Sequence, residues 1–172
     1  MSFLRSFKGL LLGLLLVVAY SSFIIDIIMI LKVRHYSNDR PPAVIALLVS
    51  SLLQAMYCLY LLMTGGKGKK NSAGNVLALT SFFAAFTFGS IVATTVLRHH
   101  TQYCNQTIPD NSDLCGVLRG TEGLGWALFG FNLLYLALLP VLVSTGGKWT
   151  SPLTELPYEH KYEEEKADAN GH

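Results

Sequence analysis

The hydrophobic and polar positions of this chain alternate on a long scale, with four apolar stretches of 20 to 23 residues separated by short polar connections. The stretches are Gly9 to Leu31, Ala43 to Met63, Val76 to Leu97 and Leu124 to Val143. At a rise of about 1.5 Å per residue, a helix of this length crosses the roughly 30 Å hydrocarbon core of a bilayer. None of the stretches shows the period-two alternation of a barrel strand. The pattern therefore predicts an all-α, polytopic membrane protein, an antiparallel bundle of four transmembrane helices.

The composition agrees with a lipid environment and divides the chain in two. Only 14% of the 172 residues are charged, and the mean hydropathy is +0.41. Arg5 and Lys8 before an apolar run resemble a signal peptide, but the run continues through "FIIDIIMIL", which favours an uncleaved first helix. Beyond Val143 the chain is rich in proline, glycine and mixed charge. We expect a transmembrane domain over residues 1–146 and a mostly disordered cytoplasmic tail over residues 147–172.

The connection between the third and fourth apolar stretches carries the clearest sign of sidedness. Cys104 and Cys115 could close a short loop by a disulfide if they face an oxidising compartment, or they stay reduced. The sequon at Asn105 makes sense on the same side, whether or not the glycan is attached. The basic residues hardly distinguish the two sides of the membrane, because six lie near the helix ends on one side and five on the other. We expect this loop outside and both termini in the cytoplasm.

Small residues recur at every fourth position of the third stretch. Ser81, Ala85, Gly89 and Ala93 form one ridge, and such ridges let helix backbones approach closely in lipid. The ridge predicts packing within the bundle, and a seam between two copies of the chain is the open alternative.

Asp26 is the one acidic or basic residue inside the four stretches. An intramembrane acid suggests a functional site by default. Asp26 lies only five residues before Leu31 and could reach the outer interface or pair with Lys32 or Arg98, so a structural, interfacial or paired aspartate is the favoured interpretation. A proton, cation or lipid site is the alternative.

The remaining polar residues give little support to catalysis. Gln54, Cys58 and Asn132 are isolated and are expected to hydrogen-bond or pack between helices. The adjacent His99 and His100 point to different faces of a helix, so they make a poor metal site. No phosphate loop, CxxC, HExxH or GxSxG motif is present, and the bases form no stripe for nucleic acid. We expect no enzyme activity, cofactor, metal or nucleic-acid partner.

Residues 1–146 resemble the MARVEL superfamily of tetraspan membrane proteins, particularly the fungal plasma-membrane type. The likeness lies in the helix arrangement, in "FGSIVATTVLRHHTQYCNQT" followed by "LC", and in "GTEGLGWALFGFNLLYLAL". The resemblance implies a disulfide between Cys104 and Cys115 and no catalytic residues. It also implies a plasma-membrane protein that organises lateral domains, membrane apposition or protein trafficking through contacts with lipids and other membrane proteins.

Two other functions remain open from the sequence. The chain is alternatively an accessory subunit of a larger membrane enzyme or transporter. Less favoured is a thiol or quinone redox protein, because such disulfide oxidases use two cysteine pairs and this chain has one pair in its loops. Claudin-like proteins and tetraspanins fit less well, since their loop signatures are absent.

Overall fold

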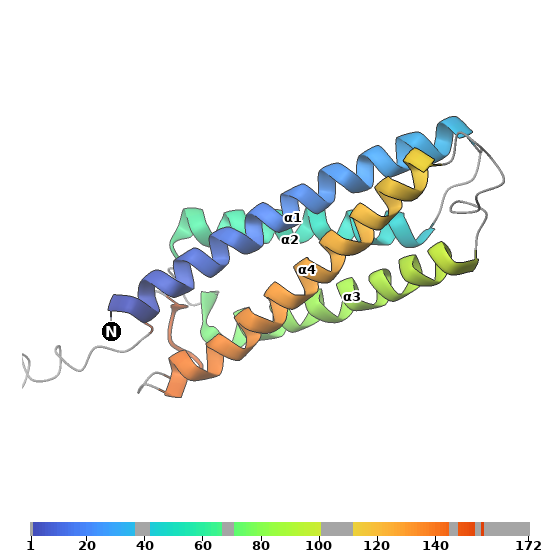
Figure 1. Cartoon of the computed structure of the whole chain (residues 1–172). Coiled ribbons are helices and arrows are strands. Elements are labelled where there is room, and N and C mark those ends of the chain that lie inside the picture. Colours follow the sequence, from blue (N-terminus) through green and yellow to red (C-terminus); the bar gives the residue numbers. More distant parts are fainter. Residues whose placement is uncertain are drawn as a thin grey trace, which may run out of the picture.

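The computed structural model describes residues 2–36, 42–66, 71–100, 112–144, 148–153 and 156. These residues form four long helices, named α1 (Ser2–Tyr36), α2 (Pro42–Thr64), α3 (Ala73–His100) and α4 (Ser112–Ser144). The helices run antiparallel, so the start of α1, the end of α2, the start of α3 and the end of α4 meet at one end of the bundle (Figure 1). Around the bundle, α1 packs between α2 and α4, and α3 completes the ring.

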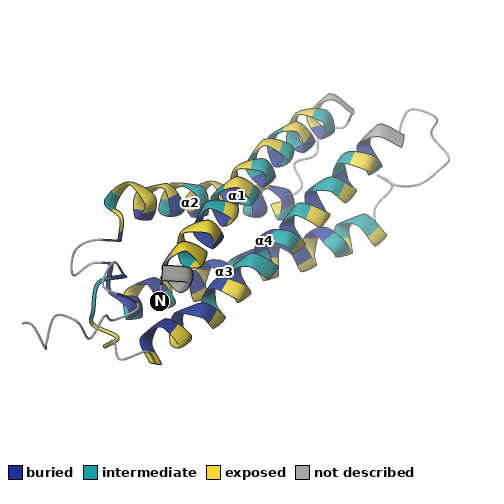
Figure 2. Cartoon of the chain, turned by 60° about the vertical axis from the view of Figure 1, so that its left-hand side comes forward, coloured by how far each residue is buried: buried dark blue, intermediate teal, exposed yellow. Residues whose placement is uncertain are grey.

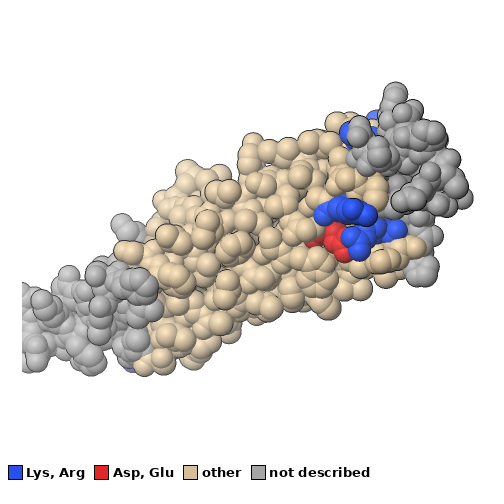
Figure 3. Space-filling view, in the orientation of Figure 1, with Lys and Arg blue, Asp and Glu red and all other residues tan. Residues whose placement is uncertain are grey.

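All four helices are long and apolar enough to cross a membrane. Large hydrophobic side chains are exposed on each of them, and a face of the bundle is almost free of charge except near one end (Figure 3). Burial follows a stripe along the inner side of each helix (Figure 2). The chain is thus a four-helix bundle with an apolar outer surface, which confirms the predicted all-α fold with four helices able to cross a membrane.

The helix boundaries extend the predicted ranges, most of all in the fourth helix. Leu124 was expected to begin that helix, but α4 begins at Ser112 and includes Arg119 and Glu122. The earlier start was missed because charged residues and glycines lower the apolar character of this part of the sequence. Cys115 consequently lies in the first turns of α4.

Local sequence signals account for several helix ends. Pro42 occupies the first helical position of α2, where a missing N–H costs nothing. At the other end, Gly65 and Gly66 adopt positive φ angles of 59° and 72°. The Gly66 N–H donates to the Leu61 carbonyl at 3.1 Å and the Gly65 N–H to the Leu62 carbonyl at 3.2 Å. This is a Schellman C-cap, and it lets the chain turn sharply toward α3.

The core has two apolar clusters with a polar layer between them. One cluster lies at the end where α1 begins and contains Leu11, Leu15 and Tyr135. The other contains Met29, Val33, Val44, Leu114 and Leu118. The chain positions between them hold the buried polar side chains Ser22, Asp26, Ser50, Ser51, Gln54, Thr87 and Asn132.

Candidate functional site

The polar layer begins with Asp26, which is fully buried on α1. Its Oδ2 accepts hydrogen bonds from Ser51 on α2 at 3.3 Å and from Ser22, one turn earlier on α1, at 3.5 Å. Its Oδ1 has no hydrogen-bond partner in the part of the chain that the structure describes. The expected interfacial position and ion pair with Lys32 or Arg98 are therefore wrong. Asp26 is held by two hydroxyl groups inside the bundle.

Two further contacts tie α2 to its neighbours at this level. The Gln54 amide donates to Asn132 Oδ1 at 2.6 Å, and the Asn132 amide donates to Gln54 Oε1 at 3.2 Å and to the Leu128 carbonyl at 3.0 Å. Ser50 and Thr87 share a hydrogen bond of 2.8 Å between α2 and α3. The expectation that Gln54 and Asn132 bond between helices is confirmed. Paired amides join helices in lipid, where hydrophobic attraction between helices is absent.

Removing one partner of the amide pair should test its contribution. Gln54→Leu leaves the Asn132 side chain in a buried site with only its carbonyl contact to Leu128, and we expect a loss of about 1 kcal/mol in the free energy of unfolding. The double variant Gln54→Leu/Asn132→Leu should recover part of this loss, because no buried amide is then left unpaired. Unfolding of the four variants in bicelles gives the coupling energy. Strictly additive losses would contradict a direct interaction.

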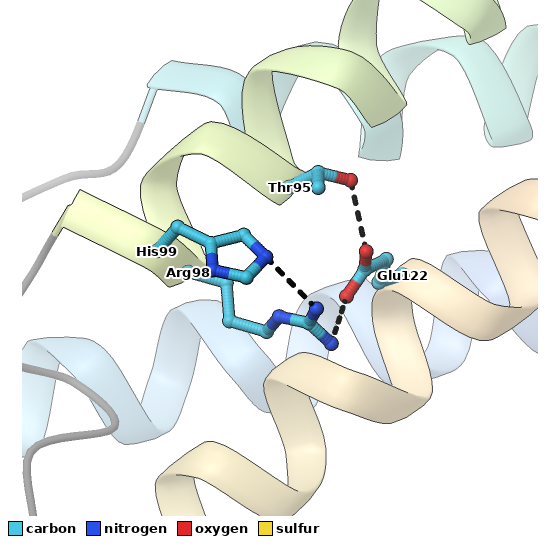
Figure 4. A network of polar contacts seen from close by, with 4 residues as sticks. All are labelled: Thr95, Arg98, His99 and Glu122. Atoms are coloured by element: carbon cyan, nitrogen blue, oxygen red, sulfur yellow. Dashed lines mark hydrogen bonds and ion pairs between the residues drawn. The ribbon is translucent and has the colours of Figure 1, made fainter.

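A second polar network lies between α3 and α4, nearer the end where α3 finishes (Figure 4). The Arg98 guanidinium forms an ion pair with Glu122 Oε2 at 2.7 Å. The Thr95 hydroxyl donates to Glu122 Oε1 at 2.9 Å, and Arg98 lies 3.2 Å from His99 Nε2. The Glu122 side chain is nearly buried, with 11% exposure, whereas the Arg98 side chain is 28% exposed. The pair thus joins α3 and α4 at a position that is partly open to the surface.

Sequence reasoning missed this ion pair. It placed Glu122 outside the membrane stretch, because the fourth apolar window began two residues later. If the fourth window is extended toward the N-terminus by one helical turn, it includes Glu122, four residues before Trp126 on the same helix face. An acidic residue inside a membrane-spanning helix is expected to have a basic partner.

The small-residue ridge of α3 does not pack inside the bundle. Ser81, Ala85, Gly89 and Ala93 are all exposed, so the expected intramolecular packing is not observed. Three of the four instead border a hollow of about 310 Å³ between α2 and α3, which is lined by Ala43, Ala46, Ala85, Phe86, Gly89, Ser90 and Ala93. We call this hollow the α2–α3 groove. Its lining is almost entirely apolar and, apart from Phe86, made of small side chains.

Side chains able to ligate a metal ion are scattered among the described residues. No group of three or more His, Cys, Asp or Glu side chains able to hold a metal occurs among them. Cys58 is a free cysteine but is buried in the apolar cluster near the start of α1. Cys104 and Asn105 lie outside the described residues, so the predicted loop bridge and glycan stay predictions.

Compared with protein-family models, curated proteins and solved structures, the chain matches none of them. The resemblance to the MARVEL superfamily therefore stays a prediction from the sequence.

Proposed function

We propose that this chain is a non-enzymatic, MARVEL-like protein that organises the plasma membrane through lateral contacts with lipids and other membrane proteins. The observation that carries the proposal is the α2–α3 groove, whose small side chains are turned outward. In lipid, helices associate where small residues let their backbones approach. A bundle that satisfies most of its polar groups inside and presents small residues outside is suited to binding a neighbouring helix, including one of a second copy.

The proposed orientation places both termini in the cytoplasm. The start of α1 and the end of α4 lie at the same end of the bundle, which supports two termini on one side (Figure 1). The loop that follows α3 then faces outside. The proposed bridge joins Cys104 to Cys115, and the third cysteine, Cys58, is free and buried in the apolar core. A peptide map under non-reducing conditions tests that pairing.

Filling the α2–α3 groove should weaken lateral association. Ala85→Leu places a larger side chain among Ala46, Phe86 and Gly89, so a neighbouring helix can no longer approach closely. We expect association between differently labelled copies, measured by energy transfer in vesicles, to weaken on the order of tenfold, a change of about 1.4 kcal/mol. In cells the same variant should disperse plasma-membrane patches seen by live imaging.

The matched control is Ala137→Leu, the same substitution at an exposed position of α4. It should leave association and distribution unchanged. Equal behaviour of the two variants would exclude the groove as the contact surface. A uniform endoplasmic-reticulum distribution of the unmodified protein would count against the membrane-organising function itself.

A further inference from the structure

The carboxyl group of Asp26 lies inside the bundle without a basic partner among the residues that the structure describes. Its contacts are with the hydroxyl groups of Ser22 and Ser51, and the Arg98–Glu122 ion pair belongs to the separate network between α3 and α4. A charge that is taken out of water is costly unless a second charge neutralises it. An ionised Asp26 therefore requires a cation, and the alternative is a proton on the carboxyl group.

The two hydroxyl groups supply Asp26 with few hydrogen bonds. Ser51 Oγ lies 3.3 Å from Asp26 Oδ2 but only 3.0 Å from the Leu48 carbonyl, and one hydroxyl proton serves one acceptor at a time. The Ser22 contact is long, at 3.5 Å. Oδ1 is buried and has no partner among the described residues. A proton would neutralise the charge, but it would leave Oδ1 without a hydrogen bond in a buried place.

A second buried oxygen atom without a partner lies at the same level of the bundle, on α4. Thr121 is fully buried, and its Oγ1 has no hydrogen bond within the described part of the chain. The residues just before Asp26 and Thr121 face each other, since a Cβ atom at Gly120 would lie 3.7 Å from Ile25 Cδ1. Asp26 and Thr121 also each lie about one helical turn from the apolar cluster that contains Met29. The two unpartnered oxygen atoms are thus placed at one level of α1 and α4.

We propose that Asp26 and Thr121 belong to a binding site for one sodium ion between α1, α2 and α4. Asp26 Oδ1 supplies the negative charge, and Thr121 Oγ1 supplies a neutral oxygen atom. Ser22 and Ser51 offer two more, because a hydroxyl oxygen that donates a proton keeps lone pairs for an ion. Hard cations take oxygen ligands of this kind. One bound ion neutralises the acid and gives both unpartnered oxygen atoms a ligand.

The charge and the packing of the site favour a small monovalent ion. Asp26 contributes a single negative charge, so a monovalent ion leaves the site neutral, whereas a divalent ion leaves a positive charge in apolar surroundings. The helices approach closely here, because a Cβ atom at Gly120 would touch the side chain of Ile25. Sodium is smaller than potassium and fits this close approach better.

The ion reaches the site from the end of the bundle where α1 finishes. Asp26 lies eight residues before Arg34, the last residue of the membrane-crossing part of α1, which is about 12 Å along the helix axis. On α4 the residue after Thr121 is Glu122, whose ion pair with Arg98 is partly open to the surface. The path from this end to Asp26 is therefore short.

The test measures reversible unfolding of the full chain in bicelles, with sodium chloride or choline chloride at constant ionic strength. We expect the ratio of folded to unfolded chains to rise about tenfold for each tenfold increase in sodium above the dissociation constant, as for one ion bound by the folded state alone. Potassium chloride should give a several-fold smaller rise. Equal stability in sodium and choline would show that Asp26 carries only a proton, and it would overturn the proposal. Equal effects of sodium and potassium would overturn the assignment to sodium.

An acid-to-amide exchange assigns the sodium dependence to Asp26. Asp26→Asn removes the charge at nearly constant size, and its stability should no longer depend on sodium. The matched control is Glu122→Gln, the same exchange at the buried acid of the other network, which should keep the full sodium dependence. Sodium dependence that persists in Asp26→Asn would contradict the site.

Thr121→Val tests the contribution of α4. The variant keeps the shape of the side chain and removes Oγ1, so it should fold in choline chloride and bind sodium about tenfold more weakly. Unchanged sodium affinity would overturn the site as assigned. If Asp26→Asn does not fold, Thr121→Val and the unmodified chain still decide, because both are compared in the same salts.

Discussion

Replacing Gly125 with alanine should lower the free energy of unfolding by about 1–3 kcal/mol, the usual range for overpacking a core. Gly125 is buried on α4, and a Cβ atom there would lie 2.9 Å from Ile91 Cγ1 on α3 and 3.5 Å from Leu47 Cδ2 on α2. The Ile91 atom is the inner part of a β-branched side chain, which is stiff at its first torsion. Three helices must therefore move apart to accommodate one methyl group.

The control for this prediction lies two residues earlier on the same helix. Gly123 is exposed, and a Cβ atom there meets nothing within 4 Å. Gly123→Ala should leave stability unchanged or raise it by up to about 1 kcal/mol, because alanine is the better helix former. Reversible unfolding of both variants in bicelles measures the difference. If both variants change the free energy of unfolding equally, the close contact of α4 with α2 and α3 does not limit the packing.

Removing the basic partner of Glu122 should give the second large effect. Arg98→Met leaves a nearly buried carboxylate with the Thr95 hydroxyl but without its cation. Breaking a fully buried ion pair costs roughly 3–5 kcal/mol. Since Arg98 is partly exposed and water reaches it, we expect a smaller loss of about 1–3 kcal/mol.

The double variant separates the ion pair from general loss of packing. Arg98→Met/Glu122→Gln leaves no unpaired charge and should recover most of the lost stability. Arg119→Met, which removes an exposed arginine one turn away on α4, serves as the control and should change stability little. The four free energies of unfolding form a cycle. A double variant as unstable as Arg98→Met would contradict the role of the unpaired carboxylate.

The orientation of side chains around each helix explains why the sequence misjudged some residues. The spacing of Ser81, Ala85, Gly89 and Ala93 defines one face of α3, but spacing does not say whether that face meets a neighbour or lipid. In a membrane both environments accept small apolar residues, so hydropathy cannot separate them. The same ambiguity applies to Asp26, whose distance from the helix end suggested the interface, although the rotation of α1 turns it toward Ser51.

The segment after α4 shows a different limit of sequence reasoning. We call its described residues, 148–153 and 156, the C-terminal strap, and it lies at the end of the bundle that carries the start of α1 (Figure 1). Its composition of proline, glycine and polar residues is typical of a disordered tail. Two leucines are too few to indicate burial from the sequence. The buried site of Leu153 and Leu156 exists only when α1, α3 and α4 are packed together. The Leu153 and Leu156 carbonyls, which accept hydrogen bonds from Lys8, carry no sequence signal at all, since every residue has a carbonyl.

The sequence by itself determined the all-α fold class, the number of helices and their approximate positions. A helix in lipid requires a long apolar run, and the chain contains four of them. It also identified Gln54 and Asn132 as residues that bond between helices. Only the tertiary structure decided which residues pair across helices, that the small-residue face is turned outward, and that the strap closes one end of the bundle. These features depend on how four similar helices are rotated and stacked, and the energies that set the rotation come from contacts between residues far apart in the chain.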